Sequence, residues 1–419
     1  MELLAPAGNI EKLRYAYLYG ADAAYIGLHG FSLRSRADNF GPDELAELRR
    51  IKAGRRLYCA LNIYFFDQDI SALEAALERI DDTLFDAFIV SDPGILPLLR
   101  RRFPSTELHL STQANCVNSE AARFYRDLGF RRIIPGRELS LAEIAAIRKA
   151  VPDVELEVFA HGAMCLAYSG RCFLSRWMSD RSANQGDCAH SCRWSYRVGT
   201  DPLVLEEQQR PGEFYPISEG DGFTEILSSR DLCMIDHLGR LRDAGVDSLK
   251  IEGRMKSIYY TALVTRAYRA ALDALQPATV AEHHSTAART AFTAELDEVS
   301  HRDYTTGFYF DRDQIERPAS RGYRRGCLFL GTVEERVGAR RFRIAVKNAF
   351  AGGQLIEFVG PRSAAQSDDT FALFDDNGNP VDRVIHHGNW YLETDCSVEE
   401  GYLIRTRPAN AAPVPGRPL

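Results

Sequence analysis

The stretch ELLAPAGNIEKLRYAYLYGADAAYIGL, residues 2–28, contains a short apolar run, an amphipathic segment and a second apolar run. Glu2–Ala7 and Ala23–Leu28 are largely apolar without polar alternation, which is typical of strands buried on both faces. Between them, Asn9 is a suitable N-cap for a helix over residues 9–19, and Gly20 suits its C-terminal end. Two such strands joined by a helix predict a parallel sheet covered by helices.

The same alternation continues through the first 255 residues. Further strands are expected at 57–64, 87–91, 107–111, 132–135, 156–160 and 248–251, and helices at 43–50, 70–79, 95–102, 119–128, 140–151 and 232–244. Eight strands alternating with helices favour a TIM-like (β/α)8 barrel. The connection from Gly162 to Arg230 is far longer than the others and follows the seventh strand. It is therefore expected at the C-terminal face of the barrel, where barrel enzymes carry their active sites.

The pattern changes after a predicted helix at 259–275. We expect a barrel over residues 1–275 that includes the Cys-rich insertion 162–230, a helical linker over 276–303 and a tail over 408–419. Residues 304–407 show short strands with Gly and Asn turns, among them the hairpin signal Asp376-Asn377-Gly378-Asn379. This region is predicted to form a small C-terminal β-barrel.

Composition excludes several classes of protein. The 419 residues are 45% apolar and carry 51 basic and 58 acidic side chains, for a formal net charge of −7. Such a chain can bury substantial cores and is not a general polycation. It has no apolar run long enough to span a membrane, and its first residues lack the basic start and apolar run of a signal peptide. We therefore expect a cytoplasmic protein that makes no membrane contact.

Five of the nine cysteines lie in the long insertion or just after it: Cys165, Cys172, Cys188, Cys192 and Cys233. Disulfides are rare in a reducing compartment, so this clustering favours metal ligation over simple packing. Only Cys188 and Cys192 have the short spacing common in structural zinc sites. The wide and irregular spacing of the others leans towards an iron–sulfur cluster.

Three segments resemble a known family. EVFAHGAMCLAYSGRCFLS at 157–175 resembles the signature of the collagenase-like peptidase family U32. NQGDCAHSCRW at 184–194 and KIEGRMK at 250–256 look like the branch of that family that hydroxylates tRNA. The resemblance runs from residue 2 to residue 309 and more loosely into the C-terminal region.

The resemblance implies an oxygen-independent hydroxylase that forms 5-hydroxyuridine at the wobble uridine of tRNA, with prephenate or a similar small carboxylate as the hydroxyl source. It also implies a 4Fe-4S cluster. The ligand positions of family members that act on ubiquinone precursors correspond here to Cys165, Cys172, Cys188 and Cys233, with Cys192 as an alternative ligand.

Polar residues just past the predicted strands are the candidates for the barrel mouth. We expect His161, Glu252 and Arg254 to be catalytic, and Asn62, Gln113, Arg137 and Lys256 to bind substrate. A dicarboxylate would need cations, and Arg137, Arg254 and Lys256 could supply them. Alternatively, Glu252 and Arg254 pair with neighbours across the mouth, and His161 is a hydrogen-bonded structural group.

Other functions stay open at this stage. Segments 165–197 and 321–343 combine Arg with aromatic residues, as single-stranded RNA sites do, although solvated surfaces show the same composition. A peptidase would need a nucleophile and a base, and Cys165 with His161 is the pair available. A ribosomal RNA hydroxylase and an RNA-binding factor structured by zinc are further alternatives. The motifs of P-loop enzymes, zinc proteases and serine hydrolases are absent from the sequence.

Overall fold

A computed structural model describes residues 1–33, 38–165, 167–172, 175, 181–189, 204–206, 214–216, 218–220, 223–225, 229–275, 294–310 and 323–407. Most of the predicted linker 276–303 and the whole tail 408–419 lie outside these ranges. Within them, no helix combines the length and apolar character needed to cross a membrane.

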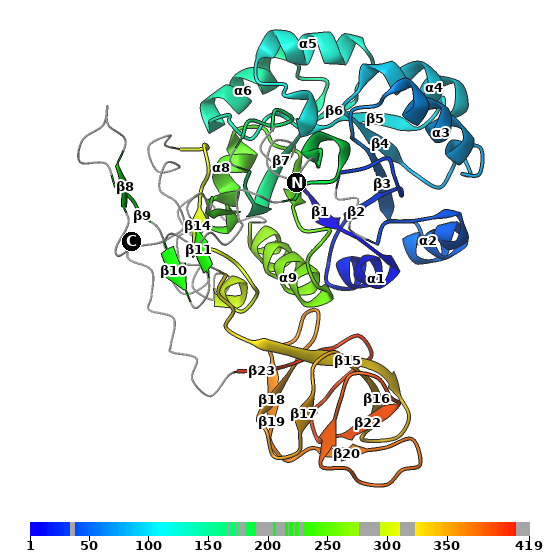
Figure 1. Ribbon diagram of the computed structural model, residues 1–419, viewed down its shortest axis with the longest axis vertical. Helices are drawn as coiled ribbons and strands as arrows, with labels where there is room; N and C mark the ends of the chain where they lie inside the picture. The colour runs from blue at the N-terminus through cyan, green and yellow to red at the C-terminus, as the bar shows by residue number, and fades with distance from the viewer. Residues whose placement is uncertain are drawn as a thin grey trace.

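The N-terminal part is a closed parallel barrel (Figure 1). Its strands are β1 (Glu2–Pro6), β2 (Ala23–Gly27), β3 (Arg56–Leu61), β4 (Ala87–Val90), β5 (Glu107–Leu110), β6 (Arg132–Ile133), β7 (Glu155–Ala163) and β13 (Ser248–Ile251). Each strand pairs in parallel with the next, and β13 pairs with both β1 and β7, which closes the ring. The predicted TIM-like barrel is confirmed, with strand positions close to those expected.

Helices surround the barrel, as Figure 1 shows. They are α1 (Ile10–Leu18), α2 (Leu45–Lys52), α3 (Asp67–Leu77), α4 (Leu96–Arg102), α5 (Ser119–Asp127), α6 (Leu141–Ala150), α8 (Leu238–Asp243) and α9 (Ile258–Ala274). Side-chain hydrogen bonds at the N-cap determine where several of these helices begin. Asn9 caps α1 by accepting a hydrogen bond from the Lys12 amide, and Ser140 forms a capping box with Glu143 at α6.

The end of the long insertion corrects one prediction. Residues 232–244 were expected to be helical, but β12 (Asp231–Cys233) pairs antiparallel with the end of β7, and helix α8 begins only at Leu238. The Asp231 carboxylate accepts a hydrogen bond from Arg302 Nη2 at 2.7 Å, and both side chains are buried. This contact and the pairing of β12 with β14 (Tyr304–Thr305) outweigh the local helical pattern. Residues 304–305 therefore extend the barrel's sheet.

Short pairs of strands also lie within the insertion. β8 (Val204–Glu206) pairs with β9 (Phe214–Pro216), and β10 (Ser218–Gly220) pairs with β11 (Phe223–Glu225).

The C-terminal region is an antiparallel sheet with its own apolar core. Its seven strands are β15 (Leu328–Arg336), β16 (Arg341–Val346), β18 (Ile356–Val359), β19 (Gln366–Asp368), β20 (Ala372–Phe374), β22 (Trp390–Glu393) and β23 (Leu403–Thr406), and β17 (Phe350–Ala351) pairs separately with β21 (Arg383–Val384). The predicted all-β region is confirmed, but its sheet begins at Leu328. Tyr19, the residue that follows α1, anchors it to the barrel by donating a hydrogen bond to the Val359 carbonyl at 2.7 Å.

Candidate active site

A pocket opens at the C-terminal ends of the barrel strands. Six predicted site residues line it: Asn62, Gln113, Arg137, Cys165, Glu252 and Arg254. They follow five different strands, and they meet because the carboxyl ends of parallel strands converge at one face of a barrel. The rest of its lining is Tyr25, Leu33, Ala60, Ile89, Ser111, Thr112, Ile134, Phe159 and Lys250. The sequence therefore predicted much of the polar lining of the pocket.

Arg254 is held through its side chain by residues of the connection that follows β2. Its side chain is only 3% exposed, and Nη1 donates hydrogen bonds to Ser32 Oγ at 3.1 Å and Asn39 Oδ1 at 3.4 Å. Gly27 makes this position possible, because a Cβ atom there would lie 1.8 Å from Arg254 Nη1. The loop that carries Arg254 is also held from α1, where Lys12 Nζ donates to the Arg254 carbonyl at 3.2 Å.

Two further lining residues, Asn62 and Arg137, are anchored by backbone groups. Asn62 Oδ1 accepts a hydrogen bond from the Leu33 amide at 3.0 Å. Arg137 Nη1 donates to the Ala163 carbonyl at 3.1 Å, and its guanidinium lies 5.2 Å from the centre of the Phe159 ring. These contacts limit the freedom of the polar side chains before any ligand binds.

Lys250 lies in the pocket but was not predicted as a site residue. Its Nζ atom donates a hydrogen bond to Glu157 Oε1 at 2.8 Å and lies 4.3 Å from the centre of the Tyr25 ring. With Arg137 and Arg254 it gives the lining three cations against the single carboxylate of Glu252, a formal surplus of two positive charges. This balance favours an anionic ligand.

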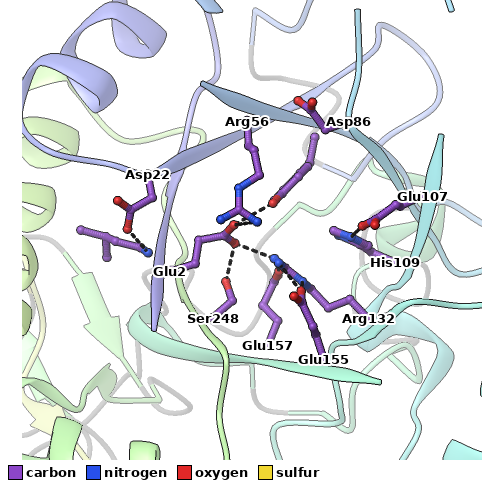
Figure 2. Close-up of polar contacts among 12 residues, drawn as sticks. Glu2, Asp22, Arg56, Asp86, Glu107, His109, Arg132, Glu155, Glu157 and Ser248 are labelled. Atoms are coloured by element: carbon purple, nitrogen blue, oxygen red, sulfur yellow. Dashed lines mark hydrogen bonds and ion pairs between the residues drawn. The ribbon is translucent and has the colours of Figure 1, made fainter. Parts of the chain in front are cut away.

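Below the pocket, a buried polar network fills the barrel interior (Figure 2). Arg132 Nη1 lies 2.6 Å from Glu2 Oε1 and 2.9 Å from Glu157 Oε2. Ser248 and Tyr58 each donate a further hydrogen bond to Glu2, at 2.8 and 2.7 Å. The expectation of strands that are apolar on both faces is therefore wrong for the inward face. Polar or charged residues at alternate positions, Glu155 and Glu157 in β7 and Ser248 and Lys250 in β13, were the sequence signal for it.

These contacts keep the interior carboxyl groups ionised. Burial opposes ionisation of Glu157, but attraction to Lys250 and Arg132 lowers its pKa below the ordinary value. Burial likewise opposes ionisation of Glu2, and Arg132 together with the Tyr58 hydroxyl lowers the pKa of that carboxyl. The network therefore provides fixed negative charge directly behind Lys250.

His161, predicted to be catalytic, does not line the pocket. It is 1% exposed, and its ring packs against Tyr268 and Tyr304, with centroids 5.5 and 5.4 Å away. The cause is an irregularity in the pairing of β7 with β13. Lys250 pairs with Phe159, but the next residue, Ile251, pairs with His161. This register shift breaks the alternation that would have pointed His161 and Phe159 in the same direction.

Lys256, predicted to bind substrate, also lies outside the pocket lining. Its Nζ atom donates to the Ser300 carbonyl at 3.4 Å and lies 4.6 Å from the centre of the Tyr323 ring. The third cation of the mouth is therefore Lys250 instead of Lys256.

The predicted cluster ligands occupy different surroundings. Cys165 is exposed at the pocket, Cys172 and Cys188 are half-buried, and Cys233 is buried opposite His161 in the pairing of β12 with β7. Across the described ranges, no three His, Cys, Asp or Glu side chains gather as the ligands of one metal ion would. Cys192 lies outside those ranges. The thiols of the described residues therefore do not form a ligand set, and we assign no catalytic step to a cluster.

A second groove borders the mouth pocket and shares Gln113 with it. Tyr64, Phe66, Tyr125 and Arg171 supply aromatic rings and a cation, and Ser91, Ala114, Gly170, Ser182, Asn184 and Gln185 complete its lining. Phe66 is 60% exposed and Arg171 is also exposed. Rings and an Arg beside a polar pocket are what a flexible RNA strand requires for base stacking and phosphate contact.

The predicted basic surface at 321–343 is largely neutralised. Arg340 lies 2.6 Å from Asp395, Arg341 3.5 Å from Glu393, and Arg343 3.1 Å from Glu334. Residues 321 and 322 lie outside the described ranges, as do Arg176, Arg193 and Arg197 of the other basic segment. The ion pairs make the C-terminal surface a weaker candidate for RNA than the groove at the mouth.

Fold and pocket together define a barrel enzyme whose site lies at the C-terminal ends of the strands. Comparison with known families agrees: the profile of Peptidase family U32 matches residues 8–318, and that of the Peptidase family U32 C-terminal domain matches residues 325–405. The chain belongs to peptidase family U32.

Individual relatives are similar along most of their length. The chain is 37% identical over 400 residues to tRNA hydroxylation protein P of Escherichia coli (strain K12), covering 86% of each chain. It is 36% identical over 394 residues to tRNA hydroxylation protein P1 of Bacillus subtilis (strain 168), covering 92% of this chain and 89% of that protein. A protein named collagenase from Porphyromonas gingivalis (strain ATCC BAA-308 / W83) is 31% identical over 383 residues, covering 86% of each.

Proposed function

We propose that this protein is a tRNA-modifying hydroxylase that converts the wobble uridine to 5-hydroxyuridine without molecular oxygen, using prephenate as the hydroxyl source. The observation that carries the proposal is the cationic mouth pocket joined through Gln113 to an aromatic groove. The relatives named tRNA hydroxylation proteins support it, since they match the chain over most of its length.

The pocket offers separate groups for the two substrates. Arg137, Lys250 and Arg254 would bind the carboxylates of the small acid. Asn62 and Gln113 carry amides that can both donate and accept hydrogen bonds, as the polar edge of a uracil requires. A base that reacts at a ring carbon must leave its stack, which costs little in an anticodon loop. Stacking of the neighbouring bases in the groove would hold the loop in place while the reacting base enters the pocket.

We further propose that Cys165, Cys172, Cys188 and Cys233 hold a 4Fe-4S cluster, with Cys192 as the alternative ligand. The support is their spacing within one insertion and the family resemblance. When bound, such a cluster would supply electron transfer next to the mouth. Anaerobic purification followed by iron and sulfide analysis tests this. A colourless protein that contains zinc instead would replace the proposal with a structural zinc site.

The functional test is genetic. In a strain whose own tRNA hydroxylation genes are deleted, expression of this chain should restore 5-hydroxyuridine derivatives, measured by mass spectrometry of nucleosides from purified tRNA. Ribosomal RNA from the same cells is analysed in parallel, since a hydroxylated ribosomal nucleoside without any change in tRNA would move the substrate to the ribosome. Unchanged tRNA and ribosomal RNA, with the protein present in soluble form, would contradict the proposed function.

The peptidase alternative has little structural support. Its expected nucleophile, Cys165, lies at the pocket, whereas its expected base, His161, is buried among tyrosine rings of α9 and β14 and does not line that pocket. Gelatin cleavage that persists through purification and is lost in Cys165→Ala would revive it.

A further inference from the structure

We infer that Lys250 forms the floor of a carboxylate-binding site at the bottom of the mouth pocket, and that Glu157 holds it there. The inference deepens the proposed function and rests on it, since the acid that supplies the hydroxyl group is the ligand expected at this site.

The position of the ammonium group points to a ligand. Lys250 is only 4% exposed, yet it lines the pocket. An ammonium group has three N–H donors, and buried donors normally find acceptors. Among the described residues, the hydrogen bond to Glu157 Oε1 is the only one that Lys250 Nζ makes. The remaining donors can therefore be satisfied by an acceptor that enters the pocket.

The group is held in place before a ligand arrives. Glu157 uses one carboxylate oxygen for Lys250 and the other for Arg132, which in turn contacts Glu2. Lys250 and Glu157 lie on the adjacent strands β13 and β7, so their separation is set by the barrel itself. The rings of Tyr25 and Phe159 flank the ammonium at 4.3 and 5.6 Å. A cation fixed in this way loses little conformational entropy when it binds an anion.

The surroundings favour a carboxylate on a small organic acid. The apolar side chains Ala60, Ile89 and Ile134 line the same pocket and can pack against the carbon skeleton of such an acid. Arg137 and Arg254 are positioned for further carboxylate oxygens in the same pocket. An RNA backbone is solvated and bulky, so its phosphates suit the exposed groove better than this buried floor.

Binding measurements on the purified full-length chain test the inference without relying on catalysis. Prephenate is titrated calorimetrically under anaerobic conditions into the wild type, Lys250→Met, Lys250→Arg and Lys256→Met. Loss of a charge-assisted hydrogen bond should weaken binding on the order of 10- to 100-fold in Lys250→Met. Lys250→Arg should retain part of the affinity. Lys256→Met is the matched control and should bind as the wild type does, because Lys256 lies outside the pocket lining.

A second variant distinguishes loss of binding from loss of folding. Lys250→Met alone leaves Glu157 without one of its two cations, whereas Glu157→Gln/Lys250→Met removes both charges together and should fold with the same loss of prephenate binding.

Wild-type affinity in Lys250→Met or in the folded double variant would overturn the inference, and so would a wild type that does not bind prephenate. Inorganic phosphate that binds more tightly than prephenate, and is lost with Lys250, would overturn the carboxylate assignment. A wild type that does not bind prephenate would also remove prephenate from the proposed function. The other results leave unchanged the nucleoside analysis that decides tRNA hydroxylation, so the inference and the proposed hydroxylation can fail separately.

Discussion

Cys233 lies directly opposite His161 where β12 pairs antiparallel with β7. Cys233 was expected to be a cluster ligand and His161 to be catalytic, and the pairing places them side by side. The strand of Cys233, β12, also pairs with β14 on its other edge. Tyr268 contacts His161 and the residue that follows Cys233, since its hydroxyl oxygen lies 3.5 Å from His161 Nδ1 and accepts a hydrogen bond from the Met234 amide at 3.1 Å. The histidine therefore belongs to the packing around β12 and does not line the mouth pocket.

The cysteine proposal predicts a selective loss of iron. Cys165→Ser, Cys172→Ser, Cys188→Ser and Cys233→Ser should each lower the iron and sulfide content of anaerobically purified protein, because a cluster needs every thiolate ligand. Cys396→Ser is the control, since Cys396 is half-buried in the C-terminal sheet region. Iron loss in Cys192→Ser, with full iron in Cys233→Ser, would move the fourth ligand to Cys192.

A glycine in β2 should be essential for the position of Arg254. In Gly27→Ala the new methyl group would overlap Arg254 Nη1, so we expect tRNA hydroxylation to fall more than about 10-fold and the free energy of unfolding to fall by about 1–3 kcal/mol. Gly41→Ala is the control, because a Cβ atom at Gly41 meets nothing within 4 Å. Nucleoside analysis and urea denaturation check both variants. Equal activity in the two would show that Arg254 does not need its present position.

The interior network should make stability depend on acid pH. The pKa values of Glu2 and Glu157 are lower in the folded protein than the ordinary value of 4.5, so below that value the unfolded chain binds more protons. Their contribution to stability is complete above pH 4.5 and is lost as the pH falls through the folded-state pKa values. Urea denaturation across a pH series should show this decline.

The double variant Glu157→Gln/Lys250→Met should show a shallower decline than the wild type, because one of the two carboxyl groups is gone. Glu74→Gln, which changes an exposed carboxylate paired with Arg101, should keep the wild-type slope. A double variant whose stability falls as steeply as that of the wild type would show that other groups control the acid transition.

The groove beside the mouth should bind RNA. Phe66→Ala and Arg171→Ser remove an exposed ring and an exposed cation, so each should weaken binding of a tRNA anticodon stem-loop about 5- to 100-fold in a fluorescence titration. Arg343→Ser is the matched control on the C-terminal sheet, where the side chain is already paired with Glu334. A larger loss in the control than in the groove variants would place the RNA on the C-terminal domain instead.

The sequence alone predicted the architecture, because short apolar runs alternating with amphipathic segments have few packing solutions other than a helix-covered parallel sheet. It also predicted much of the pocket. Residues that follow strands, such as Asn62, Gln113 and Arg137, must gather at one face once the barrel closes. Local signals failed at β12, where pairing with β7 overrode a helical pattern.

Only the tertiary structure decided which side chains face the pocket. A one-residue shift in the pairing of β7 with β13 separates His161 from the mouth, and this shift depends on contacts between strands far apart in the chain. Lys250 is held at the pocket by Glu157, which is 93 residues away in sequence. Lys256 lies outside the pocket lining and donates instead to the Ser300 carbonyl. Periodicity predicts which segments become strands, but it carries no information about such long-range charge pairs.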